Sequence, residues 1–277
     1  MGILFGLLAA ACYGAADFCG GLATRRSGMF AVAIVSQAAG FILLLGVLPF
    51  FGGHLTREGA LYGALGGACG GIGIVLLYHA LSIGKMGVVS PITAVLAASL
   101  PVVVGLLRGD HLSTWQLAGI FIALAAVVLI SLSTEPDGRF EFSTVGVREA
   151  VASGIALGGF YIFLALAGKG AGLYPLACAR FGSIVFLLLV AFALRRQVVP
   201  LASTLAIVLI GGAIDMTANV LYVLSAYAGY LSIAAVLTSL YPASTVFLAR
   251  VVLGERLANV QKLGVALALA GVALIAG

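Results

Sequence analysis

The sequence carries little charge. Lys, Arg, Asp and Glu make up 8% of its 277 residues, whereas roughly 25% is usual for a soluble domain. Apolar residues reach 63%, against roughly 45 to 50% in average proteins. These two values exclude an ordinary soluble globular protein and indicate a polytopic membrane protein. The basic residues are scattered between apolar segments, so their modest excess over acidic residues does not indicate nucleic-acid binding.

Motifs that carry chemistry are also scarce. The three histidines, His54, His79 and His111, lie on separate segments without an HExxH pattern, and no GxSxG elbow or paired acidic motif is present. The four cysteines fall in apolar stretches without CxxC spacing, which is typical of small packing residues. A nucleotide-binding loop is missing as well. We therefore expect neither an enzyme nor a cofactor or metal site, and any driving energy must come from a gradient.

Long apolar runs dominate what is present. A spanning helix needs about 20 apolar residues, and ten runs of about this size are separated by Gly, Pro or charged residues. The expected spans are 3–23, 30–51, 60–82, 87–107, 114–132, 147–168, 173–194, 203–227, 231–252 and 258–276. The sequence thus predicts an all-α membrane protein with ten transmembrane helices. The most polar stretch, 133–146, is expected to be an aqueous linker between a first half, 1–132, and a second half, 147–277.

The two halves are related by an internal repeat. At an offset of 145 residues, Gly66 to Ser131 aligns without gaps with Gly211 to Ala276. The most informative pairs are Gly109 with Gly254, Asp110 with Glu255 and Gln116 with Gln261. Because five spans per repeat is an odd number, the second copy must enter the bilayer from the opposite side. Inverted repeats of this kind are typical of alternating-access carriers, whereas a channel or a membrane scaffold, the alternatives of another class, has no physical need for them.

Charged residues inside the spans are candidates for function, because an unpaired charge in a bilayer costs several kcal/mol. Arg180 and Asp215 lie at similar estimated depths, so we expect an ion pair that acts either as a lock on the fold or in substrate or proton binding. Asp17 shares its depth with Tyr78 and His79. We expect Asp17 and His79 to form a polar cluster at one mouth of a cavity, where their protonation affects transport.

Helical spacing identifies further candidates. Gly211, Asp215, Asn219 and Tyr222 recur on one face of the span 203–227, which predicts that this face borders a cavity. Similar faces in the first and sixth spans carry Tyr13 with Asp17 and Tyr161, although glycines on such faces more often indicate helix packing. The fifth and tenth spans are almost free of polar side chains. We therefore expect spans one, three, four, six, eight and nine to line the cavity, with spans five and ten outside it.

Prolines inside two spans predict kinks. Pro91, Pro101 and Pro242 each lack an N–H and leave a carbonyl free one turn earlier, and Thr238 and Tyr241 lie on the face around Pro242. A plain packing kink is the alternative interpretation. The complete predicted substrate-binding set is Tyr13, Asp17, Tyr78, His79, Tyr161, Arg180, Asp215, Asn219, Tyr222, Thr238 and Tyr241.

Several segments resemble one known family. They are Tyr13-Gly14 to Asp17-Phe18, Leu81 to Pro91, Ser239-Leu240-Tyr241-Pro242, and Leu253-Gly254-Glu255-Arg256-Leu257 with Gln261. The chain resembles the ten-helix drug/metabolite transporters of the EamA type over essentially its whole length. The resemblance implies a multi-pass transporter of the cell membrane, which we expect to be a bacterial inner membrane, with both termini in the cytoplasm. One departure is Ala97, where the repeat predicts a partner for Pro242, so the two halves should bend unequally.

The distribution of basic loop residues conflicts with that implied orientation. Arg57, Arg108 and Lys169 lie on the side of the termini, whereas the opposite side holds Arg25, Arg26, Lys85, Arg139, Arg195, Arg196 and Arg256. The positive-inside rule alone would therefore place the termini outside the cytoplasm.

The substrate is only weakly indicated, since relatives of this type export amino acids, nucleosides, cations or drugs, and some import sugars. A cavity rich in tyrosine with few charges suits export of a neutral or aromatic amino acid. Efflux of an organic cation or drug, held by Asp17 or Asp215 and by aromatic faces, is the alternative. The expected partners are a small-molecule substrate and the lipid bilayer, with no nucleic acid and no obligate protein partner.

Overall fold

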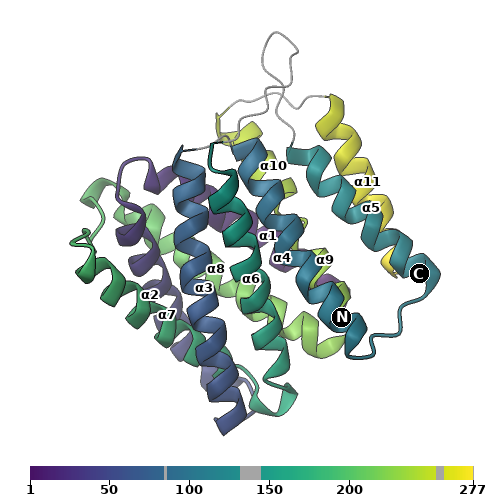
Figure 1. Ribbon diagram of the computed structural model, residues 1–277, viewed down its shortest axis with the longest axis horizontal. Coiled ribbons are helices and arrows are strands. Elements are labelled where there is room, and N and C mark those ends of the chain that lie inside the picture. Colours follow the sequence, from purple (N-terminus) through teal and green to yellow (C-terminus); the bar gives the residue numbers. More distant parts are fainter. Residues whose placement is uncertain (84–85, 132–144, 254–258, 277) are drawn as a thin grey trace.

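The computed structural model describes residues 1–83, 86–131, 145–253 and 259–276, and this part of the chain is built from helices (Figure 1). The α-helices are α1 (Gly2–Thr24), α2 (Met29–Val47), α3 (Arg57–Ile83), α4 (Met86–Leu107), α5 (Thr114–Ser131), α6 (Val147–Leu166), α7 (Tyr174–Ala193), α8 (Ala202–Ala228), α9 (Leu231–Thr238), α10 (Tyr241–Leu253) and α11 (Asn259–Ala276). Two short 3-10 helices, Leu48–Phe50 and Lys169–Ala171, lie in connections. Most of the expected linker and the Gly254-Glu255 motif lie outside the described residues.

The helices match the ten expected spans. Within the described residues, six helices are long and apolar enough to cross a membrane. They are α1, α2, α3, α6, α7 and α8. Shorter apolar segments follow in α4, α5, the α9–α10 pair and α11. Large apolar side chains such as Ile42 and Phe181 are exposed on the outside of the bundle, where lipid would cover them. The prediction of an all-α protein with ten spans is confirmed.

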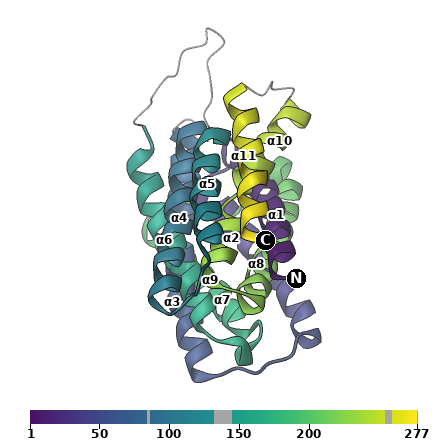
Figure 2. The same cartoon turned by 90° about the vertical axis from the view of Figure 1, so that its right-hand side faces the viewer.

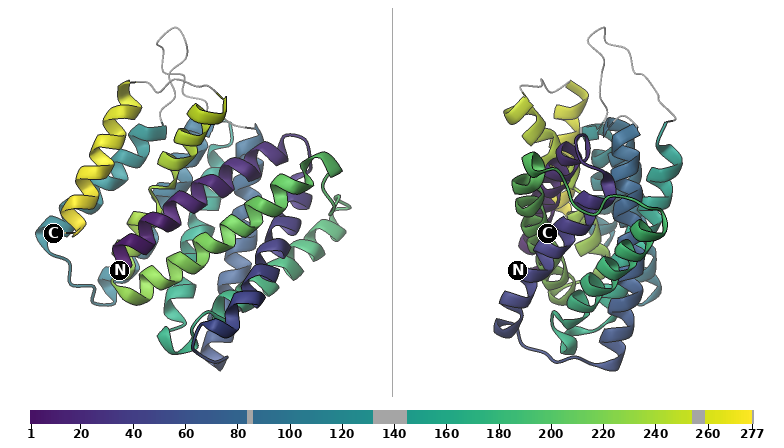
Figure 3. Two further views of the ribbon diagram at one scale, coloured as in Figure 1. Left: turned by 180° about the vertical axis from the view of Figure 1, so that it is seen from behind. Right: turned by 90° about the vertical axis from the view of Figure 1, so that its left-hand side faces the viewer.

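The packing of the helices follows the repeat. The contact of α1 with α8 has its counterpart in the contact of α6 with α3, and the contact of α2 with α8 has its counterpart in that of α7 with α3. The helices α5 and α11, which are equivalent in the two halves, pack side by side at one edge of the bundle (Figure 1, Figure 2). Both termini lie toward the same end of the bundle (Figure 3). This arrangement is that of two inverted halves around a pseudo-twofold axis.

Repeat-related glycines make two equivalent close contacts. A Cβ atom at Gly212 of α8 would lie 2.7 Å from the Cα of Ser36 in α2 and would overlap its carbonyl oxygen. A Cβ atom at Gly67 of α3 would lie 2.9 Å from the Cα of Ala179 in α7. Helices without a hydrophobic driving force between them associate best where small residues let their backbones approach. The repeated Gly-Gly-Ala sequence, Gly66-Gly67-Ala68 and Gly211-Gly212-Ala213, therefore reflects helix packing at both positions.

The ninth span is broken, whereas its counterpart is continuous. Here α9 ends at Thr238 and α10 begins at Tyr241, with Pro242 as its second residue, while α4 remains one helix across Pro101. Pro242 has no N–H to donate to the carbonyl of Thr238, but Ala97 at the equivalent place in α4 has one. The expectation of unequal bending is confirmed, and the Thr238 hydroxyl is left buried without a hydrogen-bond partner. Kinks at Pro91 and Pro101 stay predictions.

Asp110 joins the two halves on the side of the termini. Its Oδ2 accepts hydrogen bonds from the backbone N–H of Ser232 at 3.0 Å and from the Ser232 hydroxyl at 2.7 Å. Ser232 lies in the first turn of α9, whose N–H groups have no partner within their own helix. A carboxylate supplied by the connection between α4 and α5 thus caps a helix of the second half.

We expect Asp110→Ala to lower the free energy of unfolding by about 1–2 kcal/mol, because one carboxylate serves two donors at a helix start. The measurement is the midpoint of thermal unfolding in detergent. The neighbouring exposed His111 provides a matched control, and His111→Ala should leave the midpoint unchanged. Equal midpoints for both variants would contradict the capping role.

Candidate substrate-binding site

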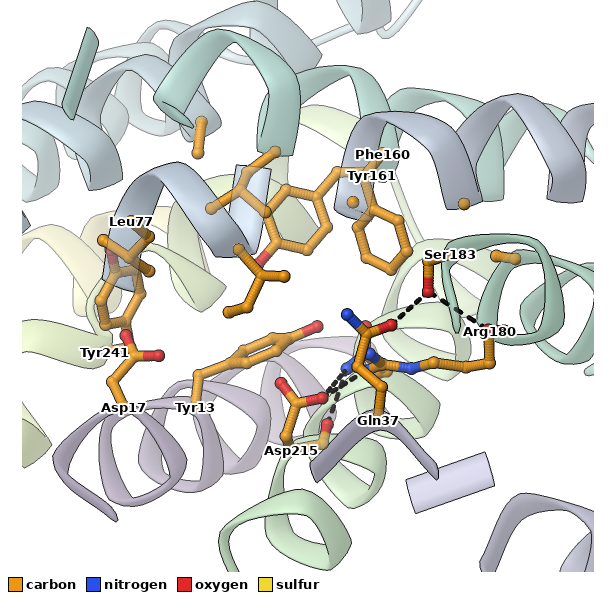
Figure 4. A pocket seen from close by; sticks show the side chains of 17 residues that line it. Tyr13, Asp17, Gln37, Leu77, Phe160, Tyr161, Arg180, Ser183, Asp215 and Tyr241 are labelled. Carbon is orange, nitrogen blue, oxygen red and sulfur yellow. Dashed lines mark hydrogen bonds and ion pairs between the residues drawn. The ribbon is translucent and has the colours of Figure 1, made fainter. Parts of the chain in front are cut away.

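A cavity lies between the two halves, and eight helices border it: α1, α2, α3, α4, α6, α7, α8 and α10 (Figure 4). Its lining side chains include Tyr13, Asp17, Gln37, Ile74, Leu77, Ala97, Leu157, Phe160, Tyr161, Arg180, Ser183, Asp215, Asn219 and Tyr241. None of the described residues of α5 or α11 borders it, as expected from their lack of polar side chains. The participation of α2 and α7 goes beyond the six spans that the sequence predicted.

An ion pair forms the polar centre of the cavity. Arg180 Nη2 of α7 donates to Asp215 Oδ2 of α8, which confirms the pairing expected from their depths. Asn219, one turn after Asp215, donates to the backbone carbonyl of Asp215 at 2.7 Å and to its Oδ2 at 3.2 Å. The Arg180 side chain is 9% exposed and that of Asp215 25%. The carboxylate is therefore the more accessible partner.

A second pair of polar side chains was not predicted. The Ser183 hydroxyl of α7 donates to Gln37 Oε1 of α2, and both side chains are buried. Ser183 lies one turn after Arg180, and its hydroxyl is also 3.2 Å from the Arg180 carbonyl oxygen. The sequence signal for this pair was Gln37, whose amide lies inside an apolar span. A buried polar group requires a hydrogen-bond partner, so a polar side chain on a neighbouring helix could have been expected.

In the part of the chain that the structure describes, three polar atoms around the cavity are buried and have no hydrogen-bond partner. They are the Tyr13 hydroxyl, Arg180 Nε and Asn219 Oδ1. The Tyr13 side chain extends from α1 toward the Arg180–Asp215 pair (Figure 4). Buried polar groups are satisfied in the great majority of native structures, so three exceptions on one cavity indicate a place for a polar ligand. They offer two donors and one acceptor beside a carboxylate.

Aromatic rings form the opposite wall. The ring centroid of Tyr161 in α6 lies 6.1 Å from that of Tyr13, 5.5 Å from that of Phe160 and 4.6 Å from that of Tyr222. The Tyr222 hydroxyl donates to the Tyr161 carbonyl at 3.1 Å, and its side chain is fully buried behind Tyr161 rather than at the cavity. Tyr222 therefore holds the ring of Tyr161 in place.

Four predicted site residues, Tyr78, His79, Tyr222 and Thr238, do not line this cavity. The cavity face of α3 runs through Gly67, Gly70, Ile74 and Leu77. Successive residues of a helix are turned by about 100°, so Tyr78 and His79 point elsewhere, and Tyr78 packs against Gly20 of α1. Asp17 lies at the end of the cavity beside Tyr241 (Figure 4). The proposed coupling of Asp17 with His79 stays a prediction.

The cavity is contracted. Its volume of about 60 Å³ holds a few water molecules, whereas sites for small organic ligands commonly measure about 300–1,000 Å³. A substrate can occupy it only if the tyrosine rings or the surrounding helices move apart.

Across the described residues, no three His, Cys, Asp or Glu side chains are grouped as metal ligands.

Ten spans in two inverted halves, with a polar cavity between them, define a membrane carrier. The chain matches the EamA-like transporter family over residues 1–132 and again over 145–277, and it belongs to that family. It is therefore a multi-pass membrane transporter.

Relatives give the fold and little about the substrate. The chain is 26% identical over 132 residues to the uncharacterized protein MJ1333.1 of Methanocaldococcus jannaschii, a match that covers 47% of this chain and 96% of that protein. A solved crystal structure superposes with a TM-score of 0.76 at 18% identity and covers 99% of this chain and 98% of that one. At this level of identity the likeness concerns the fold alone.

Proposed function

We propose that this transporter exports neutral amino acids, with aromatic or large aliphatic side chains, by alternating access across the cell membrane. The observation that carries the proposal is the combination of opposite charges with three unpartnered polar atoms on one cavity. A zwitterion presents the same combination of a cation and an anion a few ångströms apart. The export direction is supported by the resemblance to exporters of this type.

Each end of a zwitterionic substrate finds a matching group. The Arg180 Nε–H and the Tyr13 O–H are donors suited to a carboxylate, which forms strong charge-assisted hydrogen bonds. Asp215 and Asn219 Oδ1 are acceptors suited to an ammonium group. The substrate side chain would then rest against Phe160 and the apolar residues around it, which favours aromatic and large aliphatic amino acids.

The argument for the alternative substrate, an organic cation or drug, depends on Asp17. This second carboxylate borders the same cavity beside Tyr241, and aromatic faces attract cations. The Arg180 guanidinium argues against it, because a cation would be repelled there and would leave the donors of Arg180 and Tyr13 without partners. The zwitterion is the better match.

Transport requires the two halves to move relative to each other. We propose that residues 1–132 and 147–277, joined by the linker 133–146, rock around the cavity so that it opens to each side in turn. The small cavity volume supports this view, since a substrate must be accommodated by expansion.

Counterflow in proteoliposomes tests the proposal. Vesicles loaded with an unlabelled solute are diluted into its labelled form, with a panel of amino acids, nucleosides and organic cations. We expect labelled leucine or phenylalanine to accumulate transiently, because exchange through a carrier site is driven by the trans solute. Exchange of cations alone would favour the alternative, and leak without counterflow would indicate a channel.

We expect Tyr13→Phe to weaken substrate binding without lowering the stability of the protein. The hydroxyl is buried without a partner, so its removal should leave the unfolding midpoint unchanged or raise it. Counterflow at low substrate concentration should fall about tenfold, because one hydrogen bond to the substrate carboxylate is lost. Tyr227→Phe is the control, since the Tyr227 hydroxyl donates to Gly172 outside the cavity and its loss should not affect exchange. Unchanged exchange in the Tyr13 variant would contradict the assigned contact.

A further inference from the structure

A second concave site lies on the outside of the bundle, at the end of α7 opposite to its Tyr174 start. Its volume is about 800 Å³, and it shares no residue with the central cavity. Leu188, Leu189 and Phe192 form its apolar floor, and Arg195 and Arg196 close its end. Phe192 is 85% exposed, so nearly its whole ring is open to the surroundings of the bundle.

Arg195 occupies a backbone position that normally favours glycine. Its φ of 50° is left-handed, and it is the only described residue other than glycine with a positive φ. The N–H of Arg196 donates to the Ala191 carbonyl at 2.7 Å and that of Arg195 to the Phe192 carbonyl at 3.1 Å, which is the Schellman arrangement for ending a helix. A side chain there costs about 1 kcal/mol or more. An arginine at this position therefore calls for a compensating role.

A second connection with two arginines lies at the same end of the bundle. Arg25 and Arg26, both exposed, directly precede Ser27 in the turn between α1 and α2. The Ser27 hydroxyl is 2.7 Å from that of Thr204 and accepts the N–H of Leu201 at 3.0 Å, which ties this turn to the start of α8. The two connections lie side by side at the same end of the bundle (Figure 1, Figure 3). The turn that carries Arg25 and Arg26 is thus tied to the connection that follows Arg195 and Arg196.

We propose that this groove binds an anionic phospholipid of the surrounding bilayer, with its phosphate on Arg195 and Arg196 and an acyl chain along Leu188, Leu189 and Phe192. The 20 residues of α7 span about 30 Å, which matches the hydrocarbon core. The arginines after its last turn therefore lie at the level of lipid headgroups. Among the described residues, those that line the groove include no acidic side chain, so its charge complements a phosphate.

Lipid-dependent stability of the purified full-length protein tests this site. Phosphatidylglycerol or phosphatidylcholine is added to the protein in detergent, and thermal unfolding is followed together with lipid retention by native mass spectrometry. We expect phosphatidylglycerol to raise the midpoint more than phosphatidylcholine does. In the double variant Arg195→Gly with Arg196→Gln this difference should vanish, and retention of phosphatidylglycerol should fall roughly tenfold or more.

The chosen variant excludes misfolding as the cause. Glycine at position 195 removes the cost of a side chain in the left-handed conformation. The double variant should therefore be as stable as the wild type in phosphatidylcholine. Arg57→Gln, which removes an exposed arginine from the start of α3 at the other end of the bundle, should keep the full lipid response. A phosphatidylglycerol response that survives in the double variant, or that is absent from the wild type, overturns the proposal. Equal stabilisation by inorganic phosphate would overturn it too, because the site would then take a free anion.

Discussion

Arg180→Gln is expected to lower the free energy of unfolding by about 3 kcal/mol and to abolish counterflow, because it leaves Asp215 as a charge inside the membrane without its partner. Asp215→Asn should act similarly, by leaving the Arg180 guanidinium unpaired. The double variant Arg180→Gln with Asp215→Asn should recover most of the lost stability, since two amides of similar size can hydrogen-bond to each other. It should not recover transport.

This comparison separates the two roles that the ion pair could have. A bridge that only locks the fold predicts that the double variant regains transport together with stability. A bridge that also holds the substrate predicts a stable protein without exchange. Unfolding midpoints and counterflow are measured on the same preparations, and transport by the double variant near the wild-type rate would refute the binding role.

Gly212→Ala should have an effect of comparable size on the fold. The added Cβ would lie 2.7 Å from Ser36 Cα and would overlap its carbonyl oxygen, and a backbone cannot rotate out of the way as a side chain can. Separating α8 from α2 should cost about 3 kcal/mol. The measurement is thermal or denaturant unfolding in detergent.

Gly46→Ala is the matched control for this prediction. Gly46 is also helical, but a Cβ there would meet no atom within 4 Å. Alanine should therefore leave the stability unchanged or raise it by about 0.5–1 kcal/mol. Equal midpoints for the two variants would show that the close approach of α2 and α8 does not contribute to stability.

The fold was largely predictable because its signals are strong and local. Apolar runs of about 20 residues define the spans, and the ungapped repeat requires inversion once each half has five spans. The Arg180–Asp215 pair followed from depth, since an ionised group in a bilayer must find a partner at its own level. The unequal bending followed from the repeat, which places Ala97 where the second half has Pro242.

The site was less predictable, because depth along a helix does not fix its rotation. The sequence places Tyr78 and His79 at the estimated depth of Asp17, but the face of α3 that borders the cavity passes through Leu77. Gln37 and Ser183 lie on α2 and α7, which are apolar on nearly all sides. The pattern of polar and apolar residues along these helices therefore could not identify which face borders the cavity. Which faces turn inward is decided by contacts such as Gly212 with Ser36, and these need the packed structure.

The most direct test of the proposed substrate class compares three ligands that differ only in their charges. Counterflow of labelled phenylalanine is competed with unlabelled phenylalanine, with phenylalanine amide, which lacks the carboxylate, and with 3-phenylpropionate, which lacks the amine. We predict that only the zwitterion competes strongly, because the groups on Arg180, Tyr13, Asp215 and Asn219 must be satisfied at both ends of the ligand. Competition by the amide as strong as that by phenylalanine would contradict this and would identify a carrier of organic cations.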